Sequence, residues 1–106
     1  MLGGKMDWFV YILRCRDDTL YTGIAVDLRR RLEAHRRGLA AKYTRSRRPV
    51  TLAYREQQPD RSSALRREAA LRRLGRAGKL ALIGRETTVD LRVISRNGGG
   101  GSVRQR

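Results

Sequence analysis

Two ionisable side chains lie on what should be the apolar side of an early helical segment. The stripe expected to face the core reads Leu28, Arg31, Leu32 and His35, at positions i, i+3, i+4 and i+7. A desolvated arginine needs an anionic partner, and no Asp or Glu shares this stripe, so a bound phosphate is one candidate. The alternative is that Arg31 reaches solvent at the helix edge while His35 caps the helix end. Periodicity leaves both interpretations open.

An acidic residue takes a comparable position in a later helical segment. Projected on a helix, Glu68 falls on the apolar arc that contains Leu65 and Leu71. A carboxylate there can hold Mg²⁺, which prefers oxygen ligands and commonly takes one or two carboxylates together with phosphate and water. It can also pair with Arg72 one turn later, and the helix alone favours this ion pair.

The four tyrosines are candidates for chemistry and for packing. Tyr11, Tyr21 and Tyr54 lie in strand-like segments, where each can be a core residue with its hydroxyl at the surface. Tyr43 lies among basic residues, an arrangement that stacks bases in single-strand nucleic-acid sites, and a solvated basic loop is the alternative. This candidate substrate-binding loop contains Lys42, Tyr43, Thr44, Arg45, Arg47 and Arg48.

A β-hairpin is predicted to carry Tyr11 and Tyr21. Residues 8–15 are apolar on both alternating faces, which favours a strand covered on both sides, and a second strand follows a turn. For the two tyrosines to share one site, their side chains must leave the same face of the sheet. We therefore predict an odd-length loop, most simply residues 17–19, or a bulge near Gly23. A glycine within a strand also marks close approach by a ligand, which makes Gly23 a candidate substrate contact.

The remaining segments predict a small α/β domain. They are a helix over residues 28–37, a third strand over 50–56, a helix that Asp60 or Ser62 caps and Gly75 ends, and a short final helix over 76–83. The order β-β-α-β-α-α predicts an α/β fold with a small, largely antiparallel three-stranded sheet flanked by helices. We divide the chain into an N-terminal extension (1–7), one domain (8–84) and a flexible, basic, glycine-rich tail (85–106).

The charge of the chain points to a polyanionic partner. Its 25 Lys and Arg residues against 10 Asp and Glu residues give a net charge of +15, which a phosphate backbone would neutralise. The chain has no apolar run of the ~18 residues that a membrane span needs. Its single cysteine, Cys15, excludes an internal disulfide and fits a reducing compartment, where we interpret it as a small core residue.

These segments together resemble the GIY-YIG nuclease family, and within it the small stand-alone bacterial YhbQ-like (UPF0213) branch. Phe9-Val10-Tyr11 stands in the place of Gly-Ile-Tyr, and Tyr21-Thr22-Gly23 in that of Tyr-Ile-Gly. The resemblance extends over residues 8–83. The chain departs from the family where Phe9 replaces the first glycine, and it has no Asn between positions 75 and 84. The family's later features correspond to the helix with Arg31 and His35, the basic loop with Lys42-Tyr43-Thr44 and Arg47-Arg48-Pro49, and the helix with Glu68.

The resemblance implies a phosphoryl-transfer site with one divalent metal ion, Mg²⁺ or Mn²⁺. Glu68 would bind the metal, and Arg31 would stabilise charge on the non-bridging oxygens. Tyr11 would activate the attacking water, His35 would relay its proton, and Tyr21 would orient the water or phosphate. Because a tyrosine is a poor base at neutral pH, we expect the surrounding cations to lower the pKa of Tyr11.

The sequence therefore predicts a metal-dependent endonuclease that hydrolyses DNA phosphodiester bonds. We favour DNA over RNA and single-stranded or structured DNA over plain duplex, and we expect a cytoplasmic monomer that binds no membrane. The alternative is a non-catalytic basic module that binds DNA or RNA. Such a module would need the basic face but not the set Tyr11, Tyr21, Arg31, His35 and Glu68.

Overall fold

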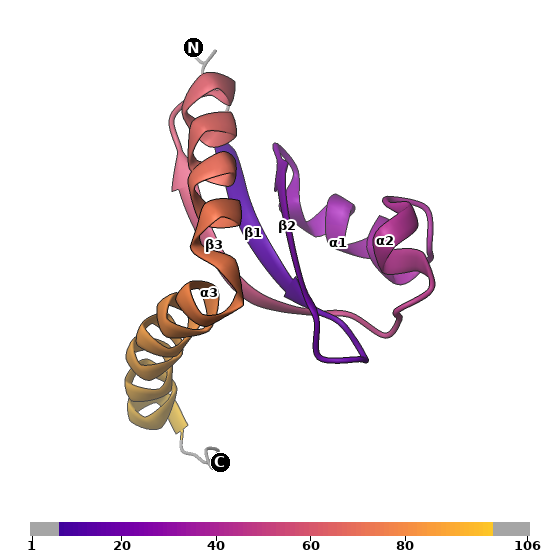
Figure 1. The fold of residues 1–106 in the computed structure, drawn as a ribbon. Helices are drawn as coiled ribbons and strands as arrows, with labels where there is room; N and C mark the ends of the chain where they lie inside the picture. Colours follow the sequence, from indigo (N-terminus) through magenta and orange to yellow (C-terminus); the bar gives the residue numbers. More distant parts are fainter. Residues whose placement is uncertain (1–6, 99–106) are drawn as a thin grey trace. The chain divides into compact units, whose positions relative to one another are not determined.

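The computed structural model describes the backbone of residues 7–98 and the side chains of residues 7–85. Its sheet has three strands in the order β2-β1-β3, with β1 (Trp8–Arg14) paired antiparallel to both β2 (Leu20–Ala25) and β3 (Thr51–Gln58). Figure 1 shows this sheet between the start of helix α3 on one side and helices α1 and α2 on the other. The predicted three-stranded antiparallel sheet flanked by helices is confirmed.

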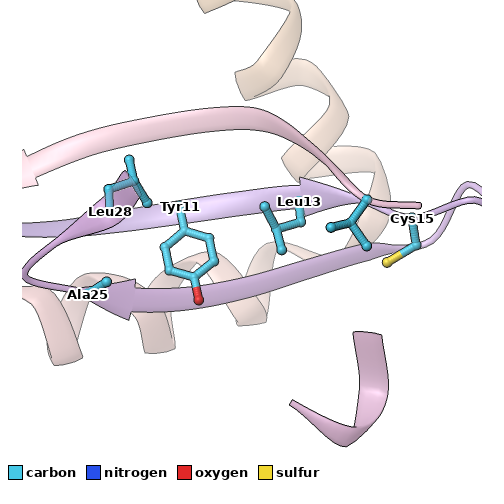
Figure 2. Packing of buried hydrophobic residues seen from close by; sticks show 6 residues of the cluster. Tyr11, Leu13, Cys15, Ala25 and Leu28 are labelled. Carbon is cyan, nitrogen blue, oxygen red and sulfur yellow. The ribbon is translucent and has the colours of Figure 1, made fainter. Parts of the chain in front are cut away.

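The central strand β1 is buried on both faces, as its composition predicts. Val10 and Ile12 point to one side and Tyr11 and Leu13 to the other, and none of the four is more than 2% exposed. The face with Tyr11 packs on helix α1 (Leu28–Arg36) through a cluster that Figure 2 shows along the hairpin. Cys15 belongs to this cluster and is a buried free thiol, as predicted.

The hairpin loop has the odd length that a shared tyrosine site requires. Tyr21 pairs with Leu13 and Gly23 pairs with Tyr11, so both tyrosines leave the same face of the sheet. The loop is residues 16–18, one position earlier than predicted, because the Cys15 amide donates to the carbonyl of Thr19 at 2.9 Å. The turn ends in a left-handed residue, Asp18, at φ 69°.

The position of the Tyr11 ring requires a glycine at position 23. A Cβ added at Gly23 would lie 2.5 Å from Tyr11 Oη and 2.7 Å from Tyr11 Cζ, because the phenol ring lies across β2 at this point. The β1–β2 register runs through Gly23 without a shift, so no bulge forms. We expected a ligand to approach this glycine closely. The close approach in the structure is made by the tyrosine ring.

Replacing Gly23 with alanine should destabilise the protein. The added methyl group would push the Tyr11 ring off its site, and overpacking of this kind costs about 1–3 kcal/mol. Chemical denaturation would measure the loss. Gly84→Ala is the matched control, because a Cβ at Gly84 meets no atom within 4 Å and alanine favours the helix there. Equal stability of the two variants would contradict the expectation.

Both ends of α1 follow the sequence signals. Asp27 caps the N-terminus, where its carboxylate accepts from the amide of Arg30 at 3.1 Å. At the other end Gly38 takes φ 78°, its amide donates to the His35 carbonyl, and the Leu39 amide donates to Ala34. This pair of bonds is a Schellman motif, which needs the left-handed glycine.

The segment predicted as a basic loop contains a further helical turn. Helix α2 (Lys42–Arg45) follows α1, and its N-cap, Ala41, makes no side-chain capping bond. A single turn without a cap has no sequence signature, so the pattern indicated only a loop. This turn fixes the directions in which the predicted substrate-binding side chains point.

Helix α3 (Arg61–Gly98) consists of two helical segments joined at Gly75. Asp60, not Ser62, caps the first segment by accepting from the Ser63 amide at 2.7 Å. Gly75 has φ 72° and breaks the helix as predicted, and the chain divides into two units there. The second segment runs to Gly98, whereas we expected a flexible chain from residue 85; no Pro or Gly interrupts residues 85–97, so the helix continues. Among the described residues, no helix has the length and hydropathy needed to cross a membrane.

Candidate active site at the β2 edge of the sheet

A buried chain of hydrogen bonds links β1, α1 and α2. Tyr11 Oη lies 2.8 Å from His35 Nε2, and His35 Nδ1 lies 2.8 Å from Thr44 Oγ1. Thr44 donates its own hydroxyl proton to the carbonyl of Ala41 at 3.2 Å, so its oxygen accepts from Nδ1. The imidazole therefore carries its proton on Nδ1 and accepts the Tyr11 proton at Nε2.

Burial sets the protonation states of Tyr11 and His35. Tyr11 and His35 are 2% and 1% exposed. Burial raises the pKa of Tyr11 well above its usual value, and the charges of Tyr21 and Glu68 add to the rise against the opposing effect of Arg31. Our expectation of a lowered Tyr11 pKa is thus wrong, because desolvation outweighs the nearby cation. Burial and the charge of Arg31 lower the pKa of His35, which stays neutral at pH 7.

Tyr21 lies against the same imidazole. Its ring meets His35 edge-on, with centroids 5.3 Å apart, and stacks on Tyr43 at 5.7 Å. The guanidinium of Arg47 lies over the Tyr43 ring at 3.9 Å. We expected Tyr43 to stack a base of the substrate. In the structure Tyr21 and Arg47 already contact its ring, so Tyr43 supports Tyr21.

Arg31 is at the rim of the site. The residue is exposed, so of the two interpretations that the sequence left open the structure supports the one in which Arg31 reaches solvent at the helix edge. The stripe of α1 is wide enough for Leu28 and His35 to be buried while Arg31 extends to solvent. Its charge still acts on both Tyr11 and His35, and a phosphate at this rim would meet the guanidinium.

Glu68 approaches Tyr11 from α3. Its side chain is 16% exposed, and Oε2 accepts from Arg72 at 3.0 Å, which is the ion pair favoured by the helix pattern. Arg72 also donates to the carbonyl of Thr22 on β2, at 3.3 Å, and this bond ties α3 to the strand next to Gly23. Within the part of the chain that the structure describes, no group of three or more His, Cys, Asp or Glu side chains is placed to hold a metal.

A metal at this site would therefore depend on one carboxylate. The charge of Glu68 is felt at Tyr11, and Arg72 bonds to only one of its two oxygens. A single carboxylate fits Mg²⁺ or Mn²⁺, which complete their octahedral shell with water and substrate phosphate. Glu68 is thus a suitable anchor for the metal that the family resemblance implies.

A second polar cluster fixes the first segment of α3 on the sheet. Glu56 of β3 accepts from Tyr54 at 2.5 Å, from Gln58 at 2.8 Å and from Arg67 at 2.7 Å. Burial favours the neutral form of Glu56, but these three hydrogen bonds together hold its pKa below the usual value. Because Arg67 precedes Glu68, this clamp sets the rotation of α3 that directs Glu68 to Tyr11. Tyr54 therefore has a structural role, which is one of the two interpretations that the sequence left open.

Besides Tyr43, three residues of the predicted substrate-binding loop form side-chain hydrogen bonds inside the protein. Thr44 is fully buried and holds His35, so it does not face a substrate. Arg47 bonds to Asp17 at 3.1 Å and to the carbonyl of Tyr43. Arg48 donates to the carbonyls of Arg45 and Arg36, at 2.9 and 3.3 Å, near the ends of α2 and α1. Lys42 and Arg45 remain exposed.

The roles of Thr44 and Arg72 were missed by the sequence analysis. Thr44 is nine residues from the imidazole it orients, and Arg72 is fifty residues from the Thr22 carbonyl it contacts. Neither spacing is a helical or strand period, so no local pattern could reveal these contacts. Only the family's loop motif pointed to Thr44, and it suggested a different role.

Comparisons with known proteins show which family the chain belongs to. The GIY-YIG catalytic domain family matches residues 7–81. The UPF0213 protein DP2720 of Desulfotalea psychrophila is 51% identical over 77 residues, which cover 72% of this chain and 70% of that one. A UPF0213 protein of Staphylococcus aureus strain Mu3 is 51% identical over 75 residues, covering 71% and 92%.

A solved structure agrees at the level of the fold. The solution NMR structure of the UPF0213 protein BH0048 from Bacillus halodurans is 39% identical, with a TM-score of 0.50, and the match covers 74% of this chain and 84% of that one. The two tyrosines, the helix with Arg31 and His35, and the helix with Glu68 all lie within the matched domain. This chain therefore belongs to the GIY-YIG nuclease superfamily and, within it, to the UPF0213 proteins.

Proposed function

We propose that the protein is a metal-dependent endonuclease that hydrolyses DNA phosphodiester bonds, with single-stranded or structured DNA as its substrate and Mg²⁺ or Mn²⁺ as its cofactor. The observation that carries the proposal is the chain of hydrogen bonds from Tyr11 through His35 to Thr44. The charges of Arg31 and Glu68 act on its Tyr11 end. A purely structural tyrosine would need one hydrogen-bond partner for its buried hydroxyl, but not Arg31 and Glu68 beside it. We also propose that the protein acts as a monomer in the cytoplasm.

The hydrogen-bonded residues Tyr11 and His35 can move a proton without forming a free phenolate. A water bound to Tyr11 Oη would give up its proton as Tyr11 passes its own to His35 Nε2, leaving a hydroxide to attack phosphorus and an imidazolium behind. The raised pKa of Tyr11 then does not oppose the reaction, because the tyrosine is protonated before and after the step. The negative phosphate near the rim favours the imidazolium.

The other site residues would act on the substrate's charge. Arg31 would donate to the non-bridging oxygens, an effect worth about 10²–10³ in rate for a preorganised donor. Tyr21 would orient the water or phosphate beside the imidazole that it contacts. Bound by Glu68, the divalent ion would supply Lewis-acid stabilisation of the leaving oxygen. Lys42 and Arg45, which are exposed, would contact the backbone of the strand.

One observation favours the second candidate, a nucleic-acid-binding module without catalysis. Glu68 already has an ion-pair partner in Arg72, and a carboxylate held in this way needs no metal. The net charge of +15 would serve such a module equally well. The alignment of Tyr11 with His35 would then be unused.

Cleavage by the purified protein would decide between the two candidates. A panel of labelled single-stranded DNA, duplex DNA, flap DNA and single-stranded RNA would be incubated with Mg²⁺, with Mn²⁺ and with EDTA. We expect metal-dependent products from single-stranded or flap DNA and none with EDTA. Tight binding of the same oligonucleotides with no product under any metal condition would replace the nuclease by the binding module.

A further inference from the structure

A pocket of about 330 Å³ lies next to the candidate active site, between the end of β2 and α1. Trp8 and Ile24 line it from the strands, Val26 lines it from the segment before α1, and Ala34 lines it from the last turns of α1. Arg30 and Arg31 also line it. The pocket and the site share Arg31, whose charge also acts on Tyr11 and His35.

The chemistry of this pocket suits a flat, apolar group attached to an anion. The indole of Trp8 is half-buried, and the guanidinium of Arg61 lies 6.0 Å from its ring centre. The one carboxylate in the lining, Asp27, accepts from the Arg30 backbone amide as the helix cap. Among the described residues, no carboxylate forms an ion pair with Arg30 or Arg31. Two cations thus lie beside an aromatic, apolar cavity.

We infer that this pocket binds one base of single-stranded DNA, next to the phosphate on which Arg31 acts. Stacking on an aromatic side chain with flanking arginines is how proteins hold unpaired bases. A base in a duplex is stacked and paired, and entering the pocket would require its extrusion at a cost of a few kcal/mol. The inference rests on the proposed function and deepens it, because it explains a preference for unpaired strands.

The fluorescence of Trp8 offers a direct test, because Trp8 is the only tryptophan in the chain. The full-length protein would be titrated in EDTA with the single strand (dT)₈, with an eight-unit abasic strand of equal charge, and with a fully paired DNA hairpin. We expect (dT)₈ to quench the tryptophan saturably and the other two ligands to bind with little quenching. Equal quenching by the abasic strand would overturn the inference, as would quenching by oligo(U)₈ alone.

Filling the pocket from α1 tests the same point by affinity. Ala34→Leu should weaken (dT)₈ binding on the order of tenfold, which is typical for the loss of one stacked base, and leave binding of the abasic strand unchanged. Ala77→Leu is the matched control, since it makes the same change at an exposed helical position outside the pocket. Thermal unfolding would verify that both variants fold. Unchanged (dT)₈ affinity in folded Ala34→Leu would overturn the inference.

The outcomes separate this inference from the proposed function. Base-dependent quenching by a protein that cuts nothing with Mg²⁺ or Mn²⁺ would reject the nuclease and retain the base pocket. Metal-dependent cleavage by a protein that binds the abasic strand and (dT)₈ alike, with equal quenching, would retain the nuclease and reject the pocket.

Discussion

Glu68→Gln should reduce metal-dependent cleavage about a thousandfold or more. The substitution keeps the shape of the side chain but removes the charge that would anchor the metal, whose stabilisation of the transition state is worth several kcal/mol. Affinity for nucleic acid should stay the same or rise slightly, because a negative charge leaves a basic surface. Single-turnover cleavage and a separate binding titration in EDTA would measure the two effects.

Glu33→Gln is the matched control for this experiment. It removes the same charge from an exposed carboxylate of α1, which lies 3.9 Å from Arg36 and outside the site. The cleavage rate of Glu33→Gln should stay within a few-fold of wild type.

Losing the ion pair with the exposed Arg72 should cost Glu68→Gln less than about 1 kcal/mol of stability. A Glu68→Gln protein that cuts at the wild-type rate would rule out Glu68 as the metal anchor.

Tyr11→Phe should lower the cleavage rate by about 10²–10⁴ while nucleic-acid binding persists. The variant keeps the ring over Gly23 and removes only the hydroxyl that would pass the proton to His35. It leaves Nε2 as a buried acceptor without its donor, which costs about 1–3 kcal/mol of stability. The rate under saturating DNA, measured with the unfolding free energy, would separate the two losses.

Tyr54→Phe provides the comparison for Tyr11→Phe. It removes the same atom from a tyrosine on β3 whose partner, Glu56, keeps its bonds to Arg67 and Gln58. Its rate should change by no more than a few-fold. Equal rates for wild type and Tyr11→Phe would show that the hydrogen-bonded chain is structural.

The pH profile of wild type should reflect His35. Its lowered pKa means that the imidazole stays neutral, and able to accept the proton, at pH values somewhat below 6.5, so the acid limb of the rate should lie below that value. The unfolded chain protonates its histidine near pH 6.5, before the folded one does, so stability should also fall as the pH drops through this window. His35 is the only histidine, which makes its NMR titration unambiguous.

Much of the fold followed from the sequence because its signals are local. The apolar residues on both faces of residues 8–14 required a central strand, and Asp27 and Gly38 set the ends of α1. The odd-length hairpin loop was predictable because side chains alternate along a strand, so two tyrosines on one face fix the parity of the register. The ionisable stripe of α1 and the acid on α3 were visible for the same reason.

The tertiary structure decided what each of these side chains does. Burial raises the pKa of Tyr11, although the sequence suggested that neighbouring cations would lower it. Arg47 and Arg48 bind carbonyls and a carboxylate within the protein, although a basic loop in the sequence suggests contact with phosphate. Gly23 serves the Tyr11 ring twelve positions away. Periodicity reports which face a residue occupies, while burial and hydrogen-bond partners depend on contacts between distant segments, which exist only once the chain has folded.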